Sequence, residues 1–446
     1  MSTSLEDLLR DAKIELVISR FEKDPSIMHE LIKHLGNEIR SIRFNATLAI
    51  GELGAESADA VSDLVECLED EDWSICREAA RSLGKIGESA VDAIPGLVGL
   101  LNDKEVTIRT AAAISIGNIG APTDEAISGL ISALNDQNEE IRTEAARSLG
   151  KLGPNANTAI PHLTNRLRDI SWTVRTAAAQ AIREIGLGSV QSIPMLVNTL
   201  EDEDWRVRYR SIETLAEIGK DATPALLEAV DHENPVVRRG AIEALGEMKA
   251  SDQHVIDSLA SRLQDKDEGV RGKATDSLRS IGMASIPALI EAHQAANKKM
   301  KIQIMSALGG MGSQGETAIP FLLGELEASD ASVRAEAARS LGKLAIGNPD
   351  IITALAASLS DAKVTVRREA ALSLGKFGQD ATLAVPDLVN SLSDDAPDVR
   401  WRASEALGRI GTNNPNALST LESLLHDRFD YVAEAAQEAL DLIGGQ

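Results

Sequence analysis

The chain has 446 residues, a net charge of −24 at neutral pH and an aromatic content of only 2%. Such an acidic balance argues against a nucleic-acid-binding protein, which needs a basic footprint for the phosphate backbone. The two cysteines do not suggest a disulfide framework, and neither a signal peptide nor a membrane-spanning apolar run is recognisable. We therefore expect a cytoplasmic protein that binds neither nucleic acid nor membrane.

A repeated unit accounts for most of the chain. The octapeptide EAARSLGK occurs at residues 78–85, 144–151 and 336–343, inside a longer pattern, D-x-x-x-V-R-x-x-A-A-x-x-L-G-x-I-G. The position usually held by the Arg of this pattern, here called the anchor, recurs every 33 residues, with two steps of 30. The anchors are Arg43, Cys76, Arg109, Arg142, Arg175, Arg208, Arg238, Arg271, Lys301, Arg334, Arg367, Arg400 and Ala433. A fixed period of this size predicts a solenoid that spans residues 1–446.

In chain order, residues 1–35 are predicted to form a degenerate N-terminal cap, and residues 36–219 regular repeats. Residues 220–312 contain both short steps, and the unit around Lys301 has lost its turn Asp, so we favour a hinge or bend there over an acidic-ligand site at its lysines. Regular repeats and a C-terminal cap follow in residues 313–446.

Each unit is predicted to form two helices, as residues 160–186 illustrate. Pro161 suits the first turn of helix A, which should end near Arg168. Ser171 should cap helix B, and Gly186 should end it with a left-handed cap. Apolar residues recur between them at helical spacing: Val174, Ala178, Ala179, Ile182 and Ile185. Because one helix pair cannot bury this stripe alone, neighbouring units are expected to stack on one another.

Three further positions are expected to build the stack. The residue four before the anchor should cap helix B, as at Asp72, Asn138, Asp204, Asn234, Asp267, Asn297 and Asp330. Small residues eight after the anchor should let helices approach closely: Gly84, Gly117, Gly150, Gly342 and Gly375. Aspartates six before the anchor predict a structural Asp–Arg ladder along the turns: Asp103, Asp136, Asp169, Asp202, Asp265, Asp361, Asp394 and Asp427.

The unit lacks the ankyrin and tetratricopeptide signatures and resembles the short HEAT repeat of the PBS-lyase-like kind over essentially the whole chain. The resemblance implies an all-α fold, a right-handed α-solenoid of about 13 short helix pairs, with the B helices on its concave side. That family includes phycobilin lyase subunits, prokaryotic scaffolds and di-iron deoxyhypusine hydroxylases, so it does not by itself define a function.

The exposed face of helix B should carry positions −3, −2, +1, +2, +5 and +9 relative to the anchor. This face holds 18 basic and 19 acidic residues, although the whole chain is strongly acidic. A nearly neutral groove of mixed charge suits a partner protein better than a polyanion. We expect a non-catalytic interaction scaffold or assembly factor that binds a protein along this groove.

Aromatic residues gather on the same predicted face, among them Phe44, Trp73, Trp172, Trp205, Tyr209 and Trp401. Trp, Tyr and Arg are the residues most often found at binding hot spots. The candidate partner-binding residues are Trp172, Trp205, Arg206, Tyr209, Arg210, Trp73, Arg77, Arg81, Arg147, Trp401 and Arg402. Two simpler interpretations remain open: the tryptophans cover the turns, and the charges of the octapeptide form ion pairs on a solvated helix face.

No catalytic residue, cofactor or metal site is expected. The hydroxylase branch carries His-Glu pairs at +1 and +2 of certain repeats, where this chain has Arg77-Glu78, Thr143-Glu144, Ala335-Glu336 and Arg368-Glu369. Its own His-Glu pairs lie elsewhere, at His29-Glu30 and His232-Glu233. Cys76 is best explained as a small buried hydrophobe. The alternative function is that of a bilin lyase or chromophore chaperone acting on a phycobiliprotein-type substrate, with the same Trp and Arg side chains holding the pigment.

Overall fold

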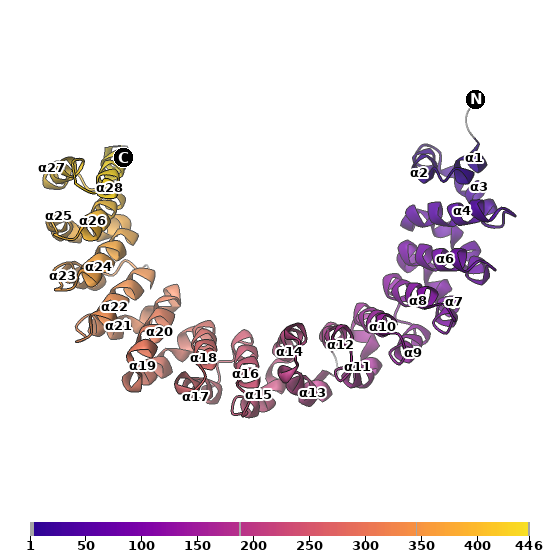
Figure 1. Cartoon of the computed structure of the whole chain (residues 1–446), viewed down its shortest axis with the longest axis horizontal. Coiled ribbons are helices and arrows are strands. Elements are labelled where there is room, and N and C mark those ends of the chain that lie inside the picture. Colours follow the sequence, from indigo (N-terminus) through magenta and orange to yellow (C-terminus); the bar gives the residue numbers. More distant parts are fainter. Residues whose placement is uncertain (1–3, 187–188, 345, 445–446) are drawn as a thin grey trace. The chain divides into compact units, whose positions relative to one another are not determined.

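The computed structural model describes residues 4–186, 189–344 and 346–444, and every regular element in these ranges is a helix (Figure 1). The residues form two compact units, within Met1–Ala229 and Val230–Gln446. The few residues outside the described ranges include the first three of the predicted N-terminal cap and the last two of the predicted C-terminal cap.

The first unit contains α1 (Leu5–Arg10), α2 (Ile14–Lys23), α3 (Met28–Leu35), α4 (Arg40–Glu52), α5 (Val61–Glu66), α6 (Trp73–Ile86), α7 (Ile94–Leu100), α8 (Val106–Ile119), α9 (Asp124–Ala133), α10 (Glu139–Lys151), α11 (Ile160–Arg166), α12 (Trp172–Ile185), α13 (Ile193–Asn198), α14 (Trp205–Ile218) and α15 (Thr223–Ala229). From α4 on, the even-numbered helices are the predicted B helices. They form one layer, on the inner side of the unit's curve, and the odd-numbered A helices form the other (Figure 1).

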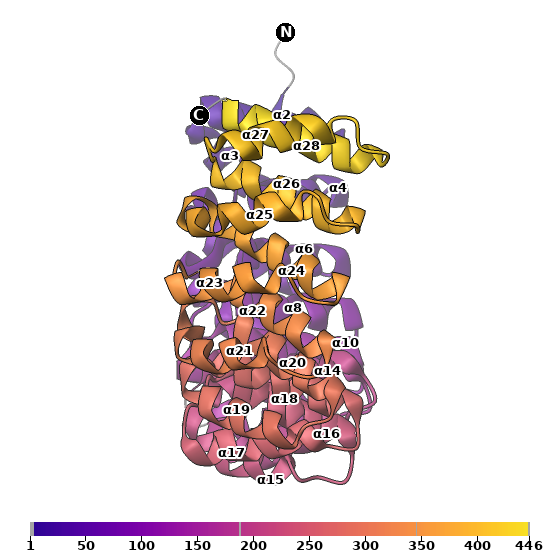
Figure 2. The ribbon, with the colours of Figure 1, turned by 90° about the vertical axis from the view of Figure 1, so that its left-hand side faces the viewer.

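The second unit contains α16 (Pro235–Glu247), α17 (Gln253–Ser261), α18 (Glu268–Ile281), α19 (Ile286–Ala295), α20 (Lys298–Gly309), α21 (Ile319–Glu325), α22 (Ala331–Leu344), α23 (Pro349–Ser358), α24 (Val364–Lys376), α25 (Val385–Ser391), α26 (Pro397–Ile410), α27 (Pro415–Leu424) and α28 (Asp430–Gly444). Figure 2 shows α22 to α28 of this unit stacked on one another. Across the described residues, each of the 13 anchors lies in its own B helix, so the predicted solenoid of helix pairs is confirmed.

The helix boundaries follow the predicted signals closely. Pro161 lies in the first turn of α11, which ends at Arg166, two residues earlier than predicted, because the chain tightens into a turn in which Arg168 N donates to Asn165 O. Seven of the eight predicted cap side chains accept a hydrogen bond from the first turn of their helix. Ser171 is the exception: its backbone is extended as expected, but its hydroxyl pairs with that of Thr173 at 2.7 Å.

Close packing of neighbouring B helices supplies most contacts between repeats. A Cβ added to Gly84, Gly117 or Gly342 would lie 2.8–2.9 Å from the Cα of a serine on the next B helix, so only glycine fits there. That serine, six residues after its anchor, often donates across the interface. Ser82, Ser148, Ser277 and Ser340 donate to the carbonyls of Thr47, Ala113, Ile242 and Met305 at 2.7–2.9 Å. The small residues therefore let the inner layer pack helix on helix, while hydroxyls hydrogen-bond across it.

The predicted Asp–Arg ladder is present along the turns. In the described part of the chain, eight anchor arginines pair at 2.6–2.9 Å with an aspartate of the following repeat: Arg43–Asp70, Arg109–Asp136, Arg142–Asp169, Arg175–Asp202, Arg238–Asp265, Arg334–Asp361, Arg367–Asp394 and Arg400–Asp427. Each guanidinium also donates to carbonyls of its own turn, as Arg142 does to Asp136 O and Gln137 O. Each Arg–Asp pair, here called a rung, thus joins two successive turns. Asp103 lacks a rung because the preceding anchor is Cys76.

One part of the predicted exposed face is wrong. Glu78, Glu336 and Glu369, all at +2, are only 3–4% exposed. This position faces the preceding B helix rather than solvent, as the bond from Arg339 of α22 to Glu369 of α24 shows. In other repeats it holds small or polar residues such as Asn45 and Ala111, also buried. The acidic side of the charge balance on the inner face is therefore smaller than the sequence suggested.

Candidate functional site

An arginine–tryptophan stack joins two neighbouring B helices in the first unit. Trp172 begins α12 and Arg206 lies in the first turn of α14, where its guanidinium carbon sits 3.4 Å from the centroid of the indole ring. Asp204, the cap of α14, orients this guanidinium through a 2.7 Å ion pair and also accepts from Arg206 N. These hydrogen bonds from Arg206 lower the pKa of Asp204 to about 2, so the carboxylate stays charged.

Two large aromatic side chains stand beside this stack on α14. Trp205 is 63% exposed and Tyr209, one turn later, is 45% exposed. Arg210 pairs with Glu213 at 2.7 Å, and its guanidinium carbon lies 5.8 Å from the Tyr209 ring centroid. The structure therefore brings together Trp172 and Arg206 across two helices and adds an exposed aromatic pair on one of them. No ring contact between Trp172 and Trp205 is found within the described ranges.

The other predicted aromatic positions form smaller clusters. Trp73 is half exposed, with the Arg77 guanidinium carbon 5.1 Å from its ring centroid. In the second unit, Arg402 lies 3.5 Å over Trp401, which also meets Tyr431 edge-on at a centroid distance of 5.6 Å. Tyr431 was missed among the candidate residues, although its position two before the anchor Ala433 belongs to the predicted face.

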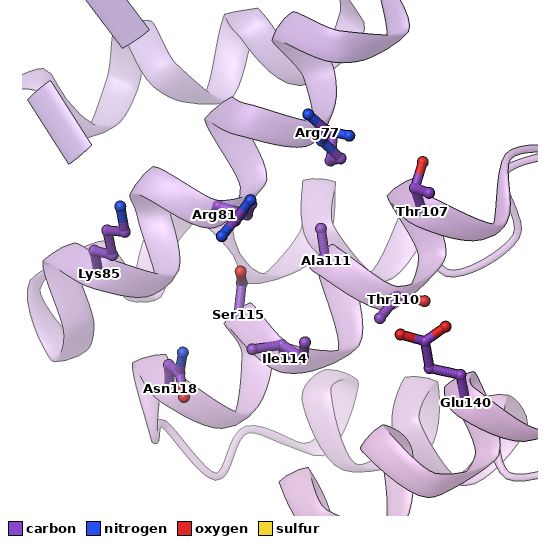
Figure 3. A pocket seen from close by; sticks show the side chains of 10 residues that line it. All are labelled: Arg77, Arg81, Lys85, Thr107, Thr110, Ala111, Ile114, Ser115, Asn118 and Glu140. Carbon is purple, nitrogen blue, oxygen red and sulfur yellow. The ribbon is translucent and has the colours of Figure 1, made fainter. Parts of the chain in front are cut away.

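A pocket of about 350 Å³ lies between α6 and α8 (Figure 3). Arg77, Arg81 and Lys85 lie along its α6 side, one per helical turn. Residues of α8 form the other side, and Glu140 of α10 closes one end. The α8 residues are Thr107, Thr110, Ala111, Ile114, Ser115 and Asn118. The pocket is thus lined by the cations of α6, by the hydroxyls of α8 and by the apolar side chains of Ala111 and Ile114.

The cations of this pocket are partly neutralised from within the protein. Lys85 pairs with Glu52 of the preceding repeat at 2.7 Å, and Arg81 lies 3.9 Å from the buried Glu78. The Nε of Arg77 has no hydrogen-bond partner. Arg147, the remaining predicted residue, lies outside the pocket and pairs with Glu144 at 2.5 Å, as the simpler ion-pair interpretation expects.

Neither cysteine is placed for nucleophilic chemistry. Cys67 and Cys76 are buried, and burial raises the pKa of each thiol to about 11. The Cys76 thiol donates to Leu68 O, which agrees with its interpretation as a small core residue. In the ranges that the structure describes, no group of three or more His, Cys, Asp or Glu side chains could hold a metal ion, and no helix is long and apolar enough to span a membrane.

Comparison with known proteins decides the family. A family model of HEAT repeats matches residues 28–116, 94–183, 160–232, 193–279, 223–309, 286–373 and 352–441. The chain belongs to the HEAT-repeat family. The narrower PBS-lyase-like assignment of this HEAT-repeat protein stays a prediction, as does its bilin-related alternative function. No curated protein matches the chain.

Three solved structures of similar fold are longer chains than this one. Kap121p bound to Nup53p matches 95% of this chain at a TM-score of 0.59 and 16% sequence identity. Kap121p bound to Pho4p matches 93% with the same TM-score and identity. The Kap95:Nup1 complex matches 97% at a TM-score of 0.55 and 14% identity. This HEAT-repeat chain spans 52–53% of the matched Kap121p chains and 69% of the Kap95 match, and at these identities the likeness concerns the fold.

Proposed function

We propose that this protein is a non-catalytic scaffold or assembly factor that binds a partner protein along the inner face of its B helices. The observation that carries the proposal is the stack of Arg206 on Trp172, flanked by the exposed Trp205 and Tyr209. A rigid aromatic surface beside oriented arginines has the composition of a binding hot spot, and large aromatic side chains gain most from being covered by a partner.

Two further features support this proposal. The matched solenoids are found in complexes with other proteins, namely Nup53p, Pho4p and Nup1. The inner layer is also held by the Asp–Arg ladder and by hydroxyl bonds between helices, so it presents its side chains on a preorganised surface, which lowers the entropic cost of association.

The test is affinity purification of the tagged protein from its native host, followed by mass spectrometry of what copurifies. The variant Trp205→Ala/Arg210→Ala removes the exposed indole of Trp205 and the partly buried guanidinium of Arg210 from the site. The matched control, Leu383→Ala/Lys363→Ala, removes an apolar and a basic side chain from exposed turns of the second unit. We expect a stoichiometric partner that survives in the control and is lost, or weakened roughly 30-fold, in the site variant.

Circular dichroism must show that both variants remain helical. If the site variant retains the partner at wild-type level, the inner face of α12 and α14 is not the binding surface. A coloured, visible-absorbing preparation that loses its pigment in the same variant would favour the bilin-related alternative instead.

A further inference from the structure

A row of three cations crosses the inner layer of the second unit. Lys343, Lys376 and Arg409 occupy the same position, nine after the anchor, in the last turns of α22, α24 and α26. These three B helices pack side by side, and all three side chains are exposed. Their position belongs to the predicted binding face, but the proposed function does not use these three residues.

The row is not neutralised by the protein. Lys343 Nζ donates to the Ser306 hydroxyl at 3.1 Å, and none of the three cations has a carboxylate within ion-pair distance in the described ranges. In the first unit the equivalent Lys85 pairs with Glu52. The difference shows that this position can be paired between repeats, whereas the three cations of the row have no carboxylate partner in the described ranges.

Nearby carboxylates are already held by other arginines. Glu369 is buried and accepts from Arg339 at 3.1 Å and from Arg368 at 3.0 Å, and Glu405 pairs with Arg402 at 2.6 Å. Partial desolvation, followed by the charge of Lys343, lowers the pKa of Lys376, and Arg339 and Arg409 act in the same direction against Glu369. The row therefore has no carboxylate of its own as an ion-pair partner.

Helix electrostatics do not explain the row. A cation in the last turn of a helix complements the helix dipole, but that benefit exists in every repeat. The same position nevertheless holds Glu in four other B helices, at Glu52, Glu184, Glu217 and Glu247. The charge at this position thus varies between groups of repeats, as expected of a surface that recognises a ligand.

The spacing of the row indicates the form of its ligand. Packed helices lie about 8–10 Å apart. A chain in the extended polyproline II conformation advances about 3.1 Å per residue with three residues per turn, so every third side chain points the same way and one turn covers one repeat. We propose that Lys343, Lys376 and Arg409 bind an extended acidic protein segment whose carboxylates recur at every third residue. This inference rests on the proposed function, because it assigns a chemistry to a protein partner on the inner layer.

A protein segment fits better than a nucleic acid. Acidic side chains alternate with the row, including Asp398 and Glu405, and the whole chain carries a net charge of −24. A continuous phosphate backbone would meet these acids at every step, whereas separate carboxylates three residues apart meet only the cations.

The experiment measures binding of fluorescent peptides to the full chain by anisotropy at low salt. The probes are a peptide of repeating Glu-Ser-Gly, a peptide of the same composition with contiguous glutamates, and a single-stranded oligothymidine. The triple variant Lys343→Glu/Lys376→Glu/Arg409→Glu is compared with Lys266→Glu/Lys363→Glu/Arg428→Glu, which changes the net charge equally at exposed positions of the same unit.

The spaced peptide should bind wild type and control alike and the row variant about tenfold more weakly or worse, with an affinity that falls as salt is added. Equal binding of the spaced and contiguous peptides, stronger binding of oligothymidine, or equal loss in the control variant would overturn the inference. Loss of the copurifying partner in the Trp205→Ala/Arg210→Ala variant without any peptide binding would leave the proposed function in place and reject only the row.

Discussion

The turns of α10 and α12 differ from the turn of α18 in how firmly they are joined to the next repeat. In the first region Arg142 reaches Asp169 and Arg175 reaches Asp202, with side chains of these pairs at most 9% exposed. In the second, Arg271 donates only to carbonyls of its own turn, Asp265 O and Lys266 O, because the residue six before the next anchor is Ala295. The same helix pairs thus stack with and without a charged rung between their turns.

This contrast separates what the helices need from what the ladder adds. The apolar stripe of α18 is still buried at Val270, Ala274 and Leu278 without a rung, although its last member, Ile281, is partly exposed whereas Ile185 of α12 is fully buried. The rung instead fixes the position of one turn against the next. Its loss where the anchor spacing shortens is the physical basis for our prediction that residues 220–312 bend more easily than the regular repeats.

Removing a ladder aspartate should have the largest effect. Asp169→Ala would leave the guanidinium of Arg142, which is 8% exposed, without its carboxylate, and we expect a loss of about 3–5 kcal/mol in the free energy of unfolding. Arg271→Ala, which breaks no rung, should cost about 1 kcal/mol. Urea denaturation followed by circular dichroism measures both. Equal losses in the two variants would show that the rung itself contributes nothing.

Buried His293 in the irregular repeats and the ladder aspartates should lose their contributions to stability at different pH values. His293 of α19 is 2% exposed, meets Phe321 edge-on and lies 3.8 Å from Glu325, both on α21. Burial, with a smaller contribution from Lys301, lowers its pKa to about 4. The unfolded chain therefore binds a proton at higher pH than the folded one does. The stability that His293 contributes is complete above pH 6.5 and is lost as the pH falls toward 4.

The ladder responds at lower pH. Burial tends to raise the pKa of Asp169, but hydrogen bonds from Arg142 and from Ser171 N outweigh it, so the pKa is lowered below 3.8. The ladder's contribution is thus present above that pH and is lost below it.

The His293 prediction is tested by urea denaturation at two pH values. At pH 5 the free energy of unfolding of the wild type should be about 2 kcal/mol lower than at pH 7, and that of a His293→Leu variant should fall much less. An NMR titration of His293 with an ordinary midpoint near 6.5 would contradict this assignment.

The sequence was sufficient for features that lie within one repeat. Caps such as Asp204, the Pro161 helix start and the anchor positions follow from local chain geometry, and the structure agrees. Features between repeats were only partly predictable. Glu78 was placed on the solvent side, although it is buried in the stack, because the periodicity of one helix does not show where its neighbours lie. The serine hydrogen bonds across the inner layer were missed for the same reason. The sequence placed Trp172 and Arg206 on the same predicted face but did not show that they stack.

Glycine substitutions should sharpen the comparison at the level of packing. A Cβ on Gly117 of α8 would lie 2.9 Å from Ser148 Cα, whereas a Cβ on Gly272 of α18 would meet no atom within 4 Å. We expect Gly117→Ala to destabilise by about 1–3 kcal/mol through overpacking, and Gly272→Ala to stabilise by up to about 1 kcal/mol through helix propensity. Thermal unfolding of both variants measures the difference, and two shifts of the same sign would refute the close-packing argument.

The smallest expected effect concerns two serines at the same position of the repeat. Ser148 donates to Ala113 O at 2.7 Å, while the buried hydroxyl of Ser373 has no partner. Ser148→Ala should therefore cost about 1 kcal/mol, and Ser373→Ala should be neutral or slightly stabilising, since it removes an unsatisfied polar group. Paired urea melts resolve this difference because the two changes delete the same atom from equivalent helices. If both variants were equally destabilised, the hydroxyl would act by filling space, and the hydrogen bond between B helices would add no measurable stability.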